Sequence, residues 1–393
     1  MTDAGTGAAP ASRLESSVLV AGAAMVVATE FTLVGISPYI AAEMELTLRQ
    51  AAGFMTSFAL GSAIVGPFAA SLTRHLRADH ALILSLTPFV LSAVLPLLGD
   101  PIGFGMLRFV QGAALPLFIG VATNALARLH GDDAVATSRI YLGVAIGALL
   151  AAPLGVAVAA WFGWTRFFLM LGLVAAAIAV AVALLPRLRL TSSAGERVGA
   201  RRILFRRSVQ AQAALTLIQF AAMFCLYAFI APILTASHVG PAAASGWLLL
   251  FGLAGIAGTM IAGYATGRAL GTAAIAIAAL LVLPGLLLQF LPLSPFALLL
   301  SLSLWGMAHS AAFVVCQLRM TRAAPQAPRL AAALNISAAN LGIALGTSIG
   351  GWSVALGGMA ALGGTAALLG LIALAGAWRV ARDLPSSVHP AAV

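Results

Sequence analysis

The chain has 393 residues, of which 62% are hydrophobic and only 8% are charged. A water-soluble globular domain is about 25% charged, so this chain has too few ionised groups to cover a soluble surface. The composition excludes a soluble enzyme, a DNA-binding protein and a disordered chain. It leaves open a membrane enzyme, a channel or a transporter. All 21 basic side chains are arginine, and 11 acids oppose them, which gives a formal charge of +10.

Twelve apolar segments are long enough to be membrane spans, since a helix that crosses a bilayer needs about 20 apolar residues. The segment that contains Arg108 is the weakest of them. We therefore predict an all-α integral membrane protein with twelve transmembrane helices. Their expected ranges are 17–42, 50–73, 81–98, 104–127, 135–159, 166–185, 208–234, 245–266, 273–291, 295–318, 331–356 and 359–379.

The distribution of charge predicts the orientation, because arginine accumulates in cytoplasmic loops. With both termini in the cytoplasm, eighteen arginines and seven acids lie inside, whereas two arginines (Arg49 and Arg166) and three acids lie outside. The positive charge is thus explained by topology and by affinity for anionic lipid. It does not indicate nucleic acid.

The longest loop, residues 186–207, carries seven arginines and one glutamate and lies halfway along the chain. It is predicted to link two six-helix bundles, residues 17–185 and 208–379. The cytoplasmic tails, 1–16 and 380–393, are expected to be disordered.

Two ionisable residues lie deep in the predicted spans, Glu30 and Arg108. A charge near the bilayer centre costs about 3 kcal/mol on insertion scales, so such residues are candidates for function. Gln111 shares a helix face with Arg108. We interpret Glu30 as a proton-titrating group whose proton is expelled when substrate binds, which is the basis of antiport. Two structural alternatives stay open: a static ion pair with Arg108, or a neutral Glu30 hydrogen-bonded to backbone.

Polar and aromatic side chains on several spans could together line a binding cavity. The alternative is that the rings pack between helices or face lipid, and that Asn335 makes an interhelical hydrogen bond. His309 is also weighed as a second proton site. The candidate substrate-binding residues are Phe31, Tyr39, Gln111, Gln219, Phe224, Tyr227, Trp305, His309 and Asn335.

Small residues at helical spacing let helices approach closely, and a proline inside a span kinks it. One such set lies in the span 135–159. Two interpretations stay open for it: a hinge or seal between the two halves, or a passive kink. A second, in the span 331–356, is interpreted as a packing face. The candidate gating and packing residues are Gly143, Gly147, Pro153, Gly155, Gly342, Gly346 and Gly350.

Several motifs resemble the major facilitator superfamily. Within it they resemble the twelve-span drug:proton antiporter branch, which includes arabinose-efflux-like, purine-nucleoside-efflux and chloramphenicol-efflux permeases. The most specific stretch is 305–352, with Q-x-R from Gln317 and N-x-G-I-A-L-G from Asn340. The first span has T-E-F-x-x-x-G-x-x-P from Thr29. Residues 108–112 read R-x-x-Q-G, similar to a motif linked to proton coupling.

Other family motifs are incomplete. The antiporter motif of the fifth span has Ala152-Pro153 in place of Gly-Pro, and the loop motifs at 69–77 and 263–268 lack the family's aspartate. The resemblance still implies two bundles related by a pseudo-two-fold axis, with a cavity lined by the first, fourth, seventh and tenth helices.

We therefore predict a proton-coupled exporter of small amphipathic drugs or metabolites. It would work by alternating access, as a monomer, in the bacterial inner membrane. No CxxC, HExxH, GxSxG or P-loop pattern occurs, so we expect no metal, no cofactor and no enzymatic activity. A sugar or nucleoside exporter of the same fold and a transport-inactive membrane sensor remain alternatives.

Overall fold

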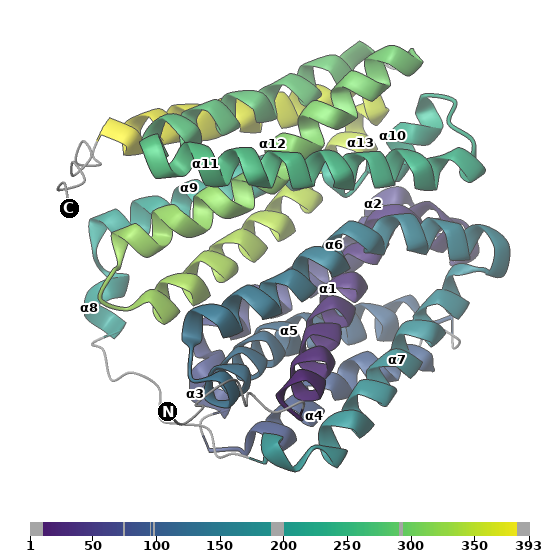
Figure 1. The fold of residues 1–393 in the computed structure, drawn as a ribbon. Helices are drawn as coiled ribbons and strands as arrows, with labels where there is room; N and C mark the ends of the chain where they lie inside the picture. The colour runs from purple at the N-terminus through teal and green to yellow at the C-terminus, as the bar shows by residue number, and fades with distance from the viewer. Residues whose placement is uncertain are drawn as a thin grey trace, which may run out of the picture.

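The structure is a computed structural model that describes residues 11–73, 75–94, 96, 99–189, 200–290 and 294–382. In these ranges the chain is built of helices joined by short turns (Figure 1). The predicted tails are described only at 11–16 and 380–382, and the remainder of each tail lies outside the described residues. Of the predicted linker, the part at 190–199 also lies outside them.

The first half of the chain consists of long helices and short helical turns. They are α1 (Ala11–Glu43), α2 (Leu48–Val65), η1 (Gly66–Phe68), α3 (Ala69–Thr73), α4 (Ala78–Val90), η2 (Leu91–Ala93), α5 (Pro101–His130), α6 (Asp133–Phe162), α7 (Trp164–Leu184) and η4 (Pro186–Leu188).

The second half is similar in construction but has two very long helices. Its elements are α8 (Ala200–Leu204), α9 (Arg207–Tyr227), α10 (Ile230–Ala236), α11 (Pro241–Leu287), η5 (Leu288–Phe290), α12 (Pro295–Ala323) and α13 (Pro328–Arg382).

Local sequence explains where several helices begin and end. Thr47 and Gln50 form a reciprocal capping box at the start of α2, with N···O distances of 3.2 and 2.9 Å. The Asp100 carboxylate accepts hydrogen bonds from two backbone N–H groups of the first turn of α5, at 3.0 and 2.8 Å. That helix ends at Gly131, whose φ of +69° is a left-handed conformation that glycine adopts without strain.

Ten helices among the described residues are long and apolar enough to cross a membrane, and Ala78–Ala93 is a shorter apolar helix. This count takes α11 as two helices, Ala243–Thr266 and Ala269–Leu287, and α13 as one. Both α11 and α13 contain a break. The chain leaves helical geometry at Ala269 in α11, between two predicted spans, and at Gly358 in α13, where φ is +67°. The predicted span at 208–234 is divided between α9 and α10. The observed helices therefore match the apolar segments, but several boundaries move.

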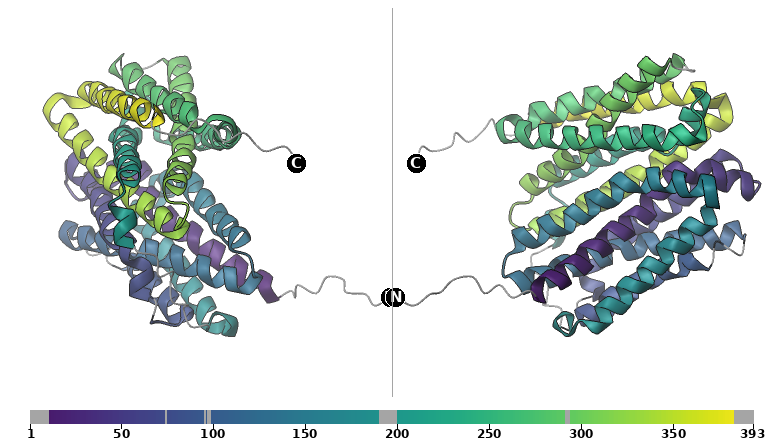
Figure 2. Two further views of the ribbon diagram at one scale, coloured as in Figure 1. Left: turned by 90° about the vertical axis from the view of Figure 1, so that its left-hand side faces the viewer. Right: turned by 45° about the vertical axis from the view of Figure 1, so that its right-hand side comes forward.

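The helices form two groups, one from each half of the chain, as Figure 1 shows. Within the first group α1 packs on α6 and α2 on α5; within the second α9 packs on α13 and α11 on α12. The groups meet where α13 packs against α2 and α11 against α6. In the right-hand view of Figure 2, α1 begins and α13 ends on the same side of the molecule.

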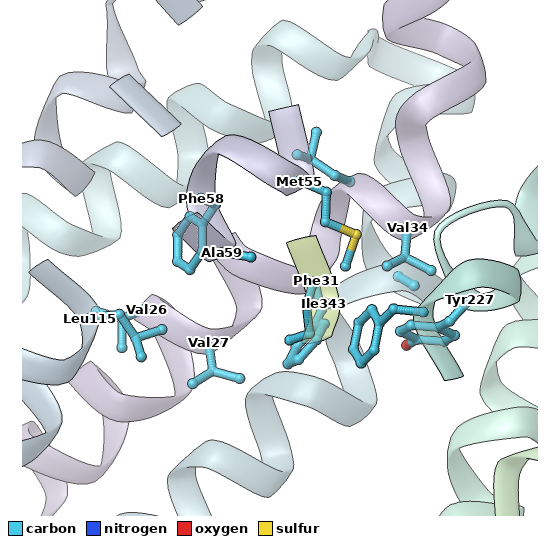
Figure 3. Packing of buried hydrophobic residues seen from close by; sticks show 14 of the residues in the cluster. Val26, Val27, Phe31, Val34, Met55, Phe58, Ala59, Leu115, Tyr227 and Ile343 are labelled. Carbon is cyan, nitrogen blue, oxygen red and sulfur yellow. The ribbon is translucent and has the colours of Figure 1, made fainter. Parts of the chain in front are cut away.

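The buried core is continuous across the two groups. Figure 3 shows Phe31 of α1 beside Ile343 of α13 and Tyr227 of α9, with Met55 of α2 close by. Large apolar side chains such as Leu253 and Met260 are exposed on the outer faces. An apolar exterior around an apolar core is the pattern of a helix bundle surrounded by lipid.

Candidate functional site

Arg108 lies in the interior of α5 and is completely buried. Its Nη1 donates hydrogen bonds to the backbone oxygen of Thr29 and to Oε1 of Gln111, both at 3.0 Å, and its Nη2 donates to the backbone oxygen of Glu30 at 3.2 Å. The guanidinium carbon also lies 4.5 Å from the centre of the Phe58 ring. Arg108 thereby fixes α5 to the backbone of α1 and to the ring of an α2 residue.

Gln111, one turn beyond Arg108, connects this site to α4. Its Oε1 accepts the bond from Arg108, and its Nε2 donates to the backbone oxygen of Pro88 at 3.1 Å and to the hydroxyl of Ser92 at 2.6 Å. The side chain is completely buried. In this conformation Gln111 orients Arg108, because each polar atom of its amide already has a protein partner.

The Glu30 carboxylate takes no part in this network, although the residue is buried. It lies within electrostatic range of Arg108, but the ion pair found among the described residues is between Arg77 and Asp79, at 2.6 Å. Neither structural alternative considered for Glu30 is therefore seen, since its carboxylate forms no ion pair and no hydrogen bond with the described residues. Arg108 instead bonds the backbone oxygen of the same residue.

An aromatic cluster surrounds His309 of α12. The imidazole centroid lies 4.5 Å from the ring of Tyr227, 5.3 Å from Phe224 and 5.5 Å from Phe251. Trp305, one turn away on α12, packs on Phe251 with centroids 5.2 Å apart. These side chains are buried against one another, so the aromatic candidate residues of the second half and His309 form one cluster.

Phe31 joins this aromatic cluster to the first half of the chain. Its ring lies 6.0 Å from Phe224 and 6.3 Å from Tyr227. Because Phe31 directly follows Glu30, the candidate proton site and the aromatic cluster are adjacent across the interface. Tyr39 is not part of this group: it is half-buried eight residues further along α1, about 12 Å away at 1.5 Å per residue.

A polar cluster lies beside the aromatic one, between α9, α12 and α13. Nη2 of Arg319 donates to Oε1 of Gln219 at 2.6 Å and to Sγ of Cys316 at 3.2 Å. Nearby, Asn335 donates to Oε1 of Gln317 at 3.0 Å and accepts from the Thr216 hydroxyl at 3.1 Å. Asn335 thus connects three helices in this conformation, which is the interhelical role weighed for it from sequence.

The glycines of α6 face α1. A Cβ at Gly143 or Gly147 would overlap the backbone oxygen of Val20 or Ala24, and one at Gly155 would be 3.2 Å from Ile36. On α13 the three candidate glycines face α9 in the same way: a Cβ would meet backbone oxygens of α9. These contacts pair Gly342 with Leu217, Gly346 with Ala221 and Gly350 with Cys225.

Pro153 lies where α6 meets the second half. Its backbone oxygen accepts a hydrogen bond from the Ser245 hydroxyl of α11 at 2.9 Å. On the other side of the interface, the hydroxyls of Thr56 in α2 and Ser348 in α13 are 3.3 Å apart. The guanidinium of Arg49 lies 4.5 Å from the Trp352 ring centre. Small polar contacts of this kind can break and re-form without exposing unpaired charge.

Sequence reasoning missed several members of these clusters. Arg319 was counted with the cytoplasmic arginines, but α12 continues to Ala323 and Arg319 is only 1% exposed. Phe251 and Phe313 also belong to the aromatic cluster. A usable signal for Arg319 was its spacing of three residues from Cys316, which places both on one helix face. Within the described ranges, no group of three His, Cys, Asp or Glu side chains could hold a metal ion.

Comparison with known proteins shows which family and which relatives this chain is similar to. The family model described as Major Facilitator Superfamily matches residues 19–329. The inner membrane transport protein YdhP of Escherichia coli K12 is 28% identical over 349 residues, which cover 86% of this chain and 88% of that protein.

Solved structures with the same fold include two transporter structures. The nucleoside transporter NupG superposes with a TM-score of 0.74 at 12% identity, covering 95% of this chain and 100% of that chain. A bacterial homologue of the human lysosomal transporter Spinster, solved in an inward-facing and unoccupied conformation, superposes with a TM-score of 0.73 at 15% identity, covering 96% of this chain and 98% of that chain. At such identities the likeness concerns the fold.

Proposed function

Since the chain belongs to the Major Facilitator Superfamily, a family of membrane transporters and not of enzymes, we propose that it exports small amphipathic molecules in exchange for protons. Its substrate class follows from the aromatic cluster, which offers apolar rings and a few polar atoms. Drugs and metabolites with an apolar body fit such a surface. The chain would work as a monomer in the inner membrane of a bacterium.

The proposal of proton coupling rests on the Glu30 carboxylate, which forms no hydrogen bond with the described residues. It is a buried acid, and Arg108 beside it is held by backbone oxygens of Thr29 and Glu30. A proton can join or leave the carboxylate without breaking a hydrogen bond to the described residues. Because Phe31 links the same turn of α1 to the aromatic cluster, substrate bound there would affect the proton site directly.

We also propose that both ends of the chain are cytoplasmic and that it crosses the membrane twelve times. The ten long helices supply most of these crossings; the break at Gly358 divides α13 in two, and α4 with its following turn is the remaining one. Residues 17–185 and 208–379 would then be two six-helix bundles that rock about their interface. Pro153, whose backbone oxygen meets Ser245 of α11, would lie on that moving interface, and Gly143, Gly147 and Gly155 would hold α6 on α1 within the first bundle.

Inverted membrane vesicles test this function. A panel of amphipathic compounds is added to vesicles acidified by respiration, and acridine orange reports proton release. A transported compound should release protons from wild-type vesicles. Glu30→Gln should abolish that response while the purified variant is still stabilised against heat by the compound.

Glu15→Gln is the matched control, because Glu15 is also a buried acid of α1 but lies near its first residue. This variant should keep the wild-type proton response. Full proton coupling in Glu30→Gln would refute the assignment.

A further inference from the structure

Arg319 is a second buried arginine, and the mechanism proposed above does not use it. It is 1% exposed, and it receives a single oxygen ligand, Oε1 of Gln219. Among the residues that the structure describes, its Nε and Nη1 have no hydrogen-bond partner, and neither does Nε2 of Gln219. Three buried donor groups thus remain without an acceptor at one place between α9 and α12.

The second half of the chain offers no carboxylate to neutralise this arginine. The sequence contains no Asp or Glu between Glu196 and Asp383. Buried charges in proteins are normally paired, because an uncompensated one is costly. Arg108 differs, since it receives three oxygen acceptors and lies close to Glu30. Arg319 therefore lacks both the counter-ion and most of the acceptors that a buried guanidinium requires.

We propose that Arg319 and Gln219 form a subsite for the anionic group of the substrate, so that the protein transports amphipathic organic acids. This inference rests on the proposed transport function and specifies its substrate class. A carboxylate is the matching ligand, because its two oxygens accept hydrogen bonds from a guanidinium in the planar geometry that arginine presents. The unpartnered amide group of Gln219 supplies a further donor.

The neighbourhood of the subsite explains why the acid would be amphipathic. Phe220 directly follows Gln219, and its ring packs on Phe313 with centroids 4.6 Å apart. Phe313 lies six residues before Arg319 on α12, about 9 Å along the helix axis, and is 37% exposed. A ligand with its carboxylate on Arg319 would therefore extend an apolar or aromatic body along the aromatic cluster.

Ligand-dependent heat stability of the purified full chain tests the subsite. The probes are 1-naphthylacetate and 4-phenylbutyrate, each compared with its neutral amide of the same size. The acids should raise the unfolding temperature in a concentration-dependent way, and the amides should require about tenfold higher concentrations or more, because they lose a charge-assisted hydrogen bond. Equal responses to acids and amides would overturn the proposal.

Substitutions of Arg319 and Gln219 test whether these residues cause the preference for acids. Arg319→Gln should lose the preference for acids, whereas Arg322→Gln, the same change at an exposed position of the same helix, should keep it. Since Arg319→Gln can impair folding, Gln219→Glu is the second variant. It places a carboxylate against Nη2 of Arg319, so the unliganded protein should become more heat-stable and should no longer respond to acids. A Gln219→Glu protein that still binds acids as the wild type does would refute the subsite.

Further measurements separate this proposal from its alternatives. Phosphatidylglycerol added to the detergent-solubilised protein tests whether a lipid headgroup is the anion; stabilisation by the lipid through Arg319, without stabilisation by the soluble acids, would overturn the substrate assignment. Proton release in vesicles is measured with the same probes. Acid-specific binding without proton release contradicts antiport and leaves the subsite intact. Proton release by neutral compounds alone would support antiport and overturn the assignment of organic acids as substrates.

Discussion

Arg108 donates a hydrogen bond to the backbone oxygen of Glu30, at 3.2 Å, and not to its carboxylate. The arginine is therefore held in place by atoms whose charge does not depend on pH. The carboxylate can change its protonation state while the guanidinium keeps its partners. This arrangement separates the structural role of Arg108 from the proposed titration of Glu30.

Substitution of Arg108 should affect both stability and coupling. Arg108→Ala removes the charge-assisted hydrogen bonds that the guanidinium donates to the backbone oxygens of Thr29 and Glu30, each worth about 1.5–3 kcal/mol. Arg108→Lys keeps the charge but cannot form the fork that reaches both oxygens, so it should lie between wild type and Arg108→Ala. Heat unfolding and proton release measure the two effects. Arg166→Ala, at an exposed position, is the control, and an unchanged pH profile of transport in Arg108→Ala would show that Arg108 has no part in coupling.

A disulfide between α2 and α13 should arrest transport if the two halves move apart. The hydroxyls of Thr56 and Ser348 are 3.3 Å apart across the interface, so Thr56→Cys with Ser348→Cys should crosslink on oxidation. Transport should stop and return on reduction with dithiothreitol. Ser353→Cys with Thr365→Cys is the matched pair, because those hydroxyls lie 2.8 Å apart within α13, and their crosslink should leave transport intact. Normal transport by the fully crosslinked first pair would exclude movement at this interface.

The packing of α6 on α1 should not tolerate a methyl group. Gly147→Ala would place its Cβ against the backbone oxygen of Ala24, and such overpacking costs about 1–3 kcal/mol. Gly120→Ala makes the same change in α5 at a position with open space around it. It should be neutral or stabilising by up to about 1 kcal/mol. Unfolding in a denaturing detergent compares the two, and equal stability of both variants would contradict the observed helix contact.

Aromatic residues of the two halves should differ in their effect on substrate. Phe224 and Phe104 are both buried in ring clusters, so replacing either by alanine should destabilise the protein by about 3–5 kcal/mol. Only Phe224→Ala should also weaken substrate binding, since Phe104 lies in a first-half cluster with Trp164 and Phe168. Binding measured well below each variant's unfolding temperature separates the two effects. A similar loss of binding in Phe104→Ala would argue against a site in the aromatic cluster.

Sequence patterns predicted the helices better than they predicted where those helices end. Apolar length and arginine boundaries identified the segments now seen as α1, α5, α6, α7 and α12. The same rule placed the end of a segment before Arg319, whereas the helix continues through Arg319 to Ala323. An arginine can be buried within a helix when polar groups of a neighbouring helix contact it. Whether such groups lie nearby depends on how the helices pack, which cannot be read from the sequence of one helix.

The candidate site was predictable as a set of residues but not as a set of contacts. Glu30 and Arg108 were singled out because charges are rare in membrane spans, and the structure brings their helices together. Which atoms Arg108 contacts depends on how α5 is rotated about its axis relative to α1, and this rotation cannot be predicted from hydropathy. The contact between Phe31 and Tyr227 could not be predicted for the same reason, since these residues are 196 positions apart in the sequence.

The break at Gly358 has a consequence for how the end of the chain can move. Before it, α13 lies on α9 through Gly342 and Gly346; after it, Gly363 lies against Gly285 of α11. A single glycine joins these two arms, so the end of the first arm fixes where the second begins. Inserting one residue there should change the geometry of this junction and displace Gly363 from Gly285 of α11. A displacement of the first arm, which packs against α2, should therefore move the point from which the second arm runs along α11.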